Sequence, residues 1–254
     1  MNILIINSGS SSIKYQLLEM PSAQVICAGM IERIGSTEAI STFKSQDYKI
    51  ERICEIKNHK EGLERITALL LDSDKGVLNS TKEIDAIGHR VVHGGNALTE
   101  TTLINNEVKN KIKLFSSLAP LHNPANLVGI EMAEKLFNSA KQIAVFDTAF
   151  HATVPVKAKK YAIPNKFYDD EGIQAYGFHG TSHKYVSKKA SEYLRNKNAK
   201  LISIHLGNGC SITAVKNGKS IDHSMGFAPS NGLVMGSRSG DIDHAIIFYM
   251  INTL

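Results

Sequence analysis

The chain has 254 residues, of which 43% are hydrophobic and 21% are charged. This length and composition are ordinary for a folded protein of one large domain or two average ones, and they exclude a disordered or fibrous chain. The 29 basic and 24 acidic residues give a net charge of +5. Because the basic residues are scattered along the sequence, a nucleic-acid partner is permitted without being indicated.

The cysteines and the N-terminus indicate in which cellular compartment the protein is expected. Cys27, Cys54 and Cys210 are an odd number and form no CxxC pair, which argues against a disulfide framework and a zinc site. The first residues contain no basic region, and their apolar run is too short for a signal peptide or a membrane span. We therefore expect a cytoplasmic protein with no membrane partner.

Hydrophobic periodicity predicts a mixture of strands and helices in chain order. The expected strands are two within residues 2–18, then one at each of 25–31, 84–95 and 142–147. The expected helices lie near 61–73, within 105–137, near 180–194 and over 245–254. In the second helical stretch, Asn123 is predicted as the N-cap and Pro124 as the first helical residue. A loop is expected from Asp147 to about Phe178.

Residues 200–222 repeat the pattern of residues 2–31: an apolar strand, a polar glycine turn, an alternating strand, a tight turn and a third strand. This repeat predicts a duplicated α/β architecture, with a first domain over 1–150 and a second over 151–254. The glycine turns at 7–12 and 207–209 would then face each other. The alternative is a coincidence between two unrelated hairpins, because hairpins are common.

The first of these turns has the composition of a phosphate-binding loop. Backbone N–H groups in a glycine-rich turn can form an anion-binding nest, and small side chains let phosphate oxygens approach. Ser8, Ser10, Ser11 and Ser12 add hydroxyl donors, and Lys14 lies on the same strand face as Ser12. No GxxxxGK[ST] motif is present, so the turn is not a Walker loop. A solvated hairpin turn explains the same residues without any function.

Seven motifs in order resemble those of the acetate kinases: NSGSSSIKY, HRVVHGG, LAPLHNPANL, VFDTAFH, YGFHGTSHKYV, HLGNGCSI and GLVMGSRSGDID. The resemblance implies two ribonuclease-H-like domains, as in the sugar kinase and actin-like ATPase superfamily. It also implies reversible transfer of the γ-phosphate of ATP to acetate, giving acetyl phosphate and ADP, by direct in-line attack of the carboxylate. The implied metal is Mg²⁺, with Mn²⁺ as an alternative. The implied assembly is a cytoplasmic homodimer of the full-length protein, without a nucleic-acid partner.

The resemblance also implies roles for individual residues. Asn7 corresponds to the family's magnesium-site residue, Asp147 to the essential acid near the metal, and His179 to the histidine that stabilises the transition state. The implied phosphate contacts are Ser10, Ser12 and Lys14 in the first loop, and His205, Leu206, Gly207, Asn208 and Gly209 in the second. The residues implied at the reacting groups are Arg90 and Arg238 beside the phosphoryl group, His122 at a further active-site position, and Val92, Leu121, Phe178 and Pro229 around the acetate methyl.

Other interpretations remain open. From the residues alone, the four apolar positions of the implied acetyl pocket are ordinary core. HRVVH and HGTSH space histidines i, i+4, but both lack the glutamate of a zinc-protease motif. A ribonuclease-H-type enzyme would need carboxylates where the first strand ends in Asn7. A kinase of another carboxylate, such as propionate, and a non-catalytic nucleotide-binding remnant are the two remaining alternatives.

The second predicted domain is short compared with the first. The resemblance implies that segments holding adenine, a second acidic magnesium ligand and a returning helix lie beyond the residues matched here. We therefore expect this chain to be the N-terminal part of such an enzyme, with an incomplete second domain. We also expect it not to turn over acetate by itself, since ATP would not be held in line for transfer.

Overall fold

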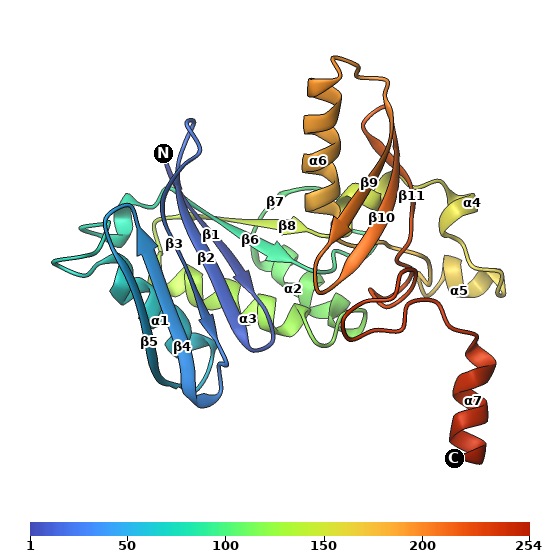
Figure 1. Cartoon of the computed structure of the whole chain (residues 1–254), viewed down its shortest axis with the longest axis horizontal. Coiled ribbons are helices and arrows are strands. Elements are labelled where there is room, and N and C mark those ends of the chain that lie inside the picture. The colour runs from blue at the N-terminus through green and yellow to red at the C-terminus, as the bar shows by residue number, and fades with distance from the viewer. The chain divides into compact units, whose positions relative to one another are not determined.

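The computed structural model describes all residues from 1 to 254 and divides them into two compact units (Figure 1). Unit 1 comprises Met1–His93 and Thr101–Phe146, and unit 2 comprises Gly94–Glu100 and Asp147–Leu254. None of the helices combines the length and apolar character that crossing a bilayer requires. The fold is mixed α/β, with a large sheet in unit 1 and a three-stranded sheet in unit 2.

Unit 1 is built on an eight-stranded sheet with the order β5-β4-β3-β2-β1-β6-β8-β7. The strands are β1 (Asn2–Ser8), β2 (Ser12–Glu19), β3 (Gln24–Glu32), β4 (Ser36–Ser45), β5 (Lys49–Ile56), β6 (Ala86–Val91), β7 (Thr102–Leu103) and β8 (Lys141–Phe146). Strands β1 to β5 form an antiparallel meander, whereas β6 is parallel to both β1 and β8. The carboxyl ends of β1, β6 and β8 therefore share one edge of the sheet.

Two helices cover a face of this sheet. They are α1 (His59–Leu70) and α3 (Asn123–Leu136), which pack against each other and against the strands. Leu63, Ile66 and Leu70 recur at helical spacing on α1 and are fully buried in the same core as Leu4 and Ile6 of β1. The remaining helical segments of unit 1 are α2 (Asn106–Leu114), η1 (Thr81–Glu83) and η2 (Phe115–Ser117).

The strands predicted within residues 2–31 are confirmed, but the sequence did not indicate that β4 and β5 continue the meander. Strand β5 lies at the sheet edge, and most of its residues are exposed. An edge strand of this kind carries little of the apolar alternation on which a sequence prediction relies. The predicted helices at 61–73 and within 105–137 are confirmed to within a few residues.

The predicted cap of α3 is wrong by one residue. His122 is the N-cap, Asn123 is the first helical residue and Pro124 the second. The Asn123 side chain is fully buried, where its Oδ1 accepts from the backbone N–H of His93 at 3.0 Å and its Nδ2 donates to the His93 carbonyl at 2.9 Å. This amide is therefore used to tie the end of β6 to α3 rather than to cap the helix.

Unit 2 contains the second copy of the three-stranded pattern, as the repeat predicts. Strand β10 (Cys210–Lys216) pairs antiparallel with β9 (Lys200–Leu206) and with β11 (Lys219–His223). Helix α6 (Gly180–Tyr193) packs along β9 (Figure 1). The predicted loop before α6 contains only short segments: η3 (Ala149–Thr153), α4 (Val156–Lys159) and α5 (Asn165–Asp169).

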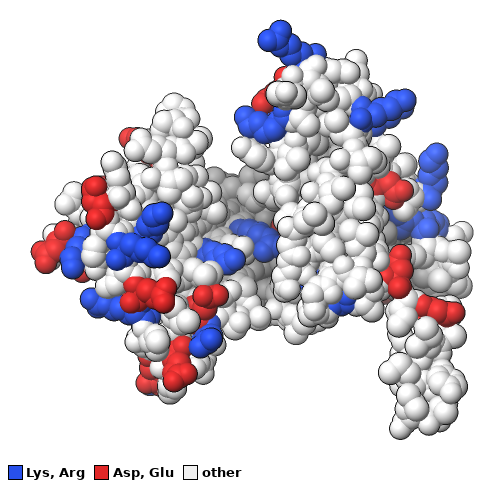
Figure 2. Space-filling view, in the orientation of Figure 1, with Lys and Arg blue, Asp and Glu red and all other residues white.

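Helix α7 (His244–Thr253) confirms the apolar helix predicted near the last residue. The Asp243 side chain caps it by accepting from the N–H of Ala245 at 2.9 Å. None of its residues is buried, and its surface is mostly uncharged in Figure 2. Elsewhere in Figure 2 lysine and arginine side chains are interspersed with acidic ones, so the visible face shows no continuous basic tract.

Candidate functional site

The turn between β1 and β2 presents backbone N–H groups to solvent. The Gly9 N–H closes the turn by donating to the Ser12 carbonyl at 2.8 Å. The carbonyls of Gly9 and Ser8 accept from His59 Nε2 at 2.6 Å and Asn126 Nδ2 at 2.6 Å. These two carbonyls are thus occupied by hydrogen bonds within the protein. The exposed part of the turn therefore offers the backbone N–H groups of Ser10 and Ser11, as an anion nest requires.

Three predicted site residues line up across β2, β1 and β6. Asn7 is the direct cross-strand partner of Lys14, so both side chains share one face of the sheet. The Arg90 Nη1 donates to Asn7 Oδ1 at 3.2 Å. Unit 1 therefore brings two permanent cations and an amide oxygen together beside the serine turn.

The other predicted residues of unit 1 differ in exposure. Val92 is buried, and its N–H donates to Asn126 Oδ1 at 3.0 Å. His122 is half-buried at the N-cap of α3, whereas Leu121 next to it is 73% exposed. Sequence reasoning missed Asn126, which joins the serine turn to the end of β6 through both ends of one amide. The sequence did offer one signal for Asn126, because it is a polar residue on the buried face of a predicted helix.

The turn between β9 and β10 is also closed by a backbone hydrogen bond, which spans residues 207–209 where that of the first turn spans residues 9–12. The Gly207 N–H donates to the Gly209 carbonyl at 3.1 Å, and the Asn208 carbonyl accepts from the Gly236 N–H at 3.2 Å. Leu206, Gly207 and Asn208 are exposed. The second predicted phosphate loop is thus also an exposed glycine turn whose carbonyls are engaged by the protein.

Gly209 is the point at which Arg238 and His179 meet. A Cβ placed on Gly209 would lie 3.3 Å from Arg238 Nη1, 3.3 Å from His179 Cε1 and 3.4 Å from His179 Nε2. Arg238 is held by its Nη1, which donates to the Pro229 carbonyl at 2.6 Å. Unit 2 therefore places a guanidinium and an imidazole beside its own glycine turn.

The backbone around His179 is held in an uncommon conformation. His179 is the N-cap of α6 with φ of 58°, in the left-handed region that residues other than glycine seldom adopt. The next residue, Gly180, donates its N–H to the Asp147 carbonyl at 2.9 Å, and a Cβ there would collide with that oxygen. Asp147 and Phe178, both predicted site residues, are buried in this region.

Five histidines cluster around α6, β9 and β11. The His179 ring stacks on His205 with centroids 4.2 Å apart, and His151 lies 4.1 Å from His223 and 5.9 Å from His183. Burial lowers the pKa of His151 and of His183 to about 4, and burial together with the neighbouring imidazoles lowers the pKa of His223 to about 2. These three rings are therefore neutral at pH 7.

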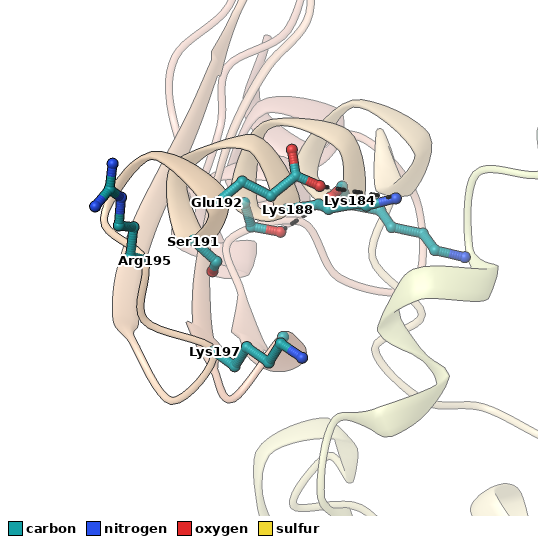
Figure 3. Close-up of a pocket in the computed structure, with 8 residues that line it drawn as sticks. Lys184, Lys188, Ser191, Glu192, Arg195 and Lys197 are labelled. Atoms are coloured by element: carbon teal, nitrogen blue, oxygen red, sulfur yellow. Dashed lines mark hydrogen bonds and ion pairs between the residues drawn. The ribbon is translucent and has the colours of Figure 1, made fainter.

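A groove of about 610 Å³ lies elsewhere in unit 2, along α6 and the chain that follows it (Figure 3). Its lining residues are Lys184, Ser187, Lys188, Ser191, Glu192, Arg195, Lys197 and Gly218. None of the predicted site residues lines it. Lys188 and Glu192 form an ion pair at 3.9 Å along this face of α6, as is common on an exposed helix surface.

Comparison with known proteins gives the family of the chain. The acetokinase family model matches residues 2–254. The chain belongs to the acetokinase family. It is 61% identical to an acetate kinase of Flavobacterium johnsoniae over 254 residues, covering 100% of this chain and 64% of that protein.

Two solved structures of acetokinase relatives show the same fold. The first is a propionate kinase from Francisella tularensis, with a TM-score of 0.93, 44% identity and coverage of 99% of this chain and 64% of that one. The second is an acetate kinase from Porphyromonas gingivalis, with a TM-score of 0.92, 42% identity and coverage of 99% and 64%. The chain thus spans about 64% of the length of each of these three relatives.

Proposed function

We propose that this protein transfers the γ-phosphate of ATP to acetate, giving acetyl phosphate and ADP, in a reversible reaction. The observation that carries the proposal is the convergence of Arg238 and His179 on Gly209 within an acetokinase chain. Those side-chain types match the reaction, since an arginine can cancel phosphoryl charge and an imidazole can donate a hydrogen bond to a phosphoryl oxygen.

The acceptor needs no general base. An acetate carboxylate is already ionised at pH 7, so no proton must be removed before it attacks the phosphorus. The barrier arises from repulsion between two anions and from charge on the transferring oxygens, which positioning and electrostatics can lower. We assign that work to Arg90, Arg238 and His179. The two glycine turns would hold the nucleotide phosphates by their N–H groups.

The carboxyl pocket is assigned from the family resemblance. Val92, Leu121, Phe178 and Pro229 would contact the acetate methyl, as that resemblance implies. Asp147 would orient water on the metal or a basic partner, and His122 would complete the site. Propionate is a second candidate acceptor, because a propionate kinase shares this fold and 44% of the sequence.

Mg²⁺ fits the residues that would hold it. Asn7 offers one amide oxygen near the end of β1; it accepts from Arg90 Nη1 at 3.2 Å and has a second lone pair, and the exposed Ser10 and Ser11 follow in the turn. Mg²⁺ prefers oxygen ligands and is commonly bound through substrate phosphates, waters and only one or two protein groups. When bound, the ion would neutralise charge on the phosphate oxygens. Mn²⁺ would suit the same oxygen ligands. A cytoplasmic location and a homodimer are further proposals that rest on the family alone.

The test is a hydroxamate assay for acetyl phosphate with ATP, Mg²⁺ and acetate. It compares the 254-residue chain with an extended protein, which adds the part of the Flavobacterium johnsoniae enzyme that this chain does not match. We expect acetyl phosphate from the extended protein, none above background from the 254-residue chain, and loss of activity in Arg238→Ala. A folded extended protein that binds ATP but phosphorylates neither acetate nor propionate would overturn the proposal and favour a non-catalytic nucleotide-binding role.

A further inference from the structure

The side chains behind His179 form a single hydrogen-bonded row. The Ser211 Oγ lies 2.9 Å from His179 Nδ1 and 2.8 Å from His183 Nε2. The other ring nitrogen of His183, Nδ1, lies 3.0 Å from the Ser203 Oγ. Ser203, His183 and Ser211 are all buried, so water does not substitute for these bonds.

The single proton of Ser211 couples the two histidines. A hydroxyl has one proton to donate, so Ser211 can donate to only one of the two ring nitrogens and must accept from the other. His183 is neutral at pH 7, because burial lowers its pKa to about 4, and it therefore has one N–H to donate. The row has only two consistent arrangements, which run in opposite directions.

The buried Ser203 hydroxyl selects between these directions. If His183 Nδ1–H donated to Ser203, the proton of Ser203 would be buried without an acceptor, since His183 is its only side-chain hydrogen-bond partner. A buried donor without an acceptor costs stability. In the favoured direction, Ser203 donates to His183 Nδ1, His183 Nε2–H donates to Ser211, and Ser211 donates to His179 Nδ1.

We propose that Ser203, His183 and Ser211 are positioning residues that keep neutral His179 in the Nε2–H form. His179 Nε2 is the nitrogen beside Gly209 and Arg238, so this form places an N–H donor next to the glycine turn. The inference rests on the proposed function in that His179 donates to a phosphoryl oxygen during transfer. No proton needs to leave the ring in that role.

The direct test is the protonation of each ring nitrogen, read at pH 7 from long-range ¹H–¹⁵N correlations of the histidine-labelled 254-residue chain. In the parent chain we expect a proton on Nε2 and none on Nδ1 for both His179 and His183. Ser211→Ala removes one oxygen atom and should give His179 as a mixture of tautomers. Ser182→Ala is the matched control, because it removes a similar 2.9 Å bond from His205 Nδ1 and should leave the His179 tautomer unchanged.

Kinetics of the extended protein supply an independent readout. Ser211→Ala and His183→Leu should lower kcat about a hundredfold while changing KM little, because the lost effect is that of a correctly protonated donor. His183→Gln retains an N–H that can reach Ser211 and should recover most of that loss. If His183→Leu fails to fold, the kcat of the smaller Ser211→Ala change still tests whether the row positions His179.

Failure of the inference and failure of the proposed function give different results. If Ser211→Ala leaves both the His179 tautomer and kcat unchanged in an active protein, the positioning role is wrong while the kinase assignment stands. If no carboxylate is phosphorylated, the kinase assignment is wrong, and the spectra alone report whether the row sets the tautomer. A parent chain with the proton on His179 Nδ1 would overturn the inference in either case.

Discussion

The two glycine turns share one supersecondary design but differ in the chemistry placed around it. The β1–β2 turn is surrounded by serine hydroxyls and the cations Lys14 and Arg90. The β9–β10 turn is surrounded by Arg238 and by the imidazoles of His179 and His205, behind which His183 is buried and neutral. The first region thus relies on permanent charge, and the second on one permanent charge together with oriented dipoles.

The strands that lead into these turns also differ in how far neighbouring strands and side chains cover them. Strand β1 is paired on both edges, with β2 and with β6, and its Leu4 and Ile6 are buried. Strand β9 is paired only with β10, and its Ile202 and Ile204 are 67% and 53% exposed. A glycine turn closed by a backbone hydrogen bond thus forms at the end of both strands, although its length and its surroundings differ.

The largest effect is expected from removing the permanent charge beside either turn. In the extended protein, Arg238→Ala and Arg90→Ala should each lower kcat about a thousandfold, as for other arginines that stabilise phosphoryl-transfer charge. Lys184→Ala, in the groove along α6, is the control and should retain the parental kcat. A variant whose KM rises at unchanged kcat would assign that arginine to substrate binding rather than to the transition state.

Acid should destabilise unit 2 more than unit 1. Burial lowers the pKa of His151 to about 4 from an unfolded value near 6.5, so between these pH values the unfolded chain binds more protons. The contribution is present in full above pH 6.5 and is lost as the pH falls to about 4, at roughly 3 kcal/mol per histidine. Unit 1 has two histidines whose pKa is lowered by burial, His89 and His93. Unit 2 has three, His151, His183 and His223.

Hydrogen exchange measured by mass spectrometry at pH 7 and pH 5, corrected for intrinsic rates, checks this difference. The amides of β9 to β11 should lose more protection than those of β1 to β3. His151→Gln, which cannot take up the proton, should weaken the pH dependence of unit 2 only. Equal loss of protection in both units would contradict the difference drawn between the two regions.

The sequence predicted most of the strands, both glycine turns and the helices α1, α3, α6 and α7 because each has a strong local pattern, whereas it missed β4 and β5. It could not predict the arrangement around Gly209, since Arg238 and His179 are far apart in the chain and only the fold brings them together. The roles of Ser211 and Ser203 were also missed. Ser203 lies in β9 and Ser211 in β10, and a serine in each of two strands looks ordinary until the fold places the buried His183 between their hydroxyls.

An intermediate effect is expected at the proposed acetyl pocket. Val92→Ala removes volume from a buried residue and should raise the kcat/KM ratio of propionate to acetate, by at most about 10- to 200-fold for a change of this size. The control Val128→Ala makes the same change on α3, where Val128 is 43% exposed. If both variants leave the ratio unchanged, Val92 is a core residue and not a pocket residue.

A smaller difference should separate alanine substitutions in the two turns. A Cβ at Gly209 meets the functional atoms of Arg238 and His179, whereas a Cβ at Gly9 lies 3.1 Å from the Ser12 hydroxyl, which can rotate away. We expect Gly209→Ala to lower kcat about tenfold through small displacements and Gly9→Ala to lower it less. Gly88→Ala in β6, whose Cβ would meet nothing within 4 Å, is the control. A larger loss of kcat in Gly9→Ala would show that the serine turn tolerates a side chain less well than the β9–β10 turn.

The smallest effect is expected on the exposed face of β9. Ile202→Thr keeps a β-branched residue in the strand and should change the free energy of unfolding by about 0.5 kcal/mol or less, because the side chain is 67% exposed. Ile5→Thr is the matched change in β1, where Ile5 is 38% exposed between two paired strands, and it should cost more. Urea unfolding of both variants measures the difference, and sedimentation at several protein concentrations measures self-association. If Ile202→Thr destabilises the chain as much as Ile5→Thr and also lowers its sedimentation coefficient, a second copy covers the β9 face in solution, and the contrast in cover between the two strands does not hold.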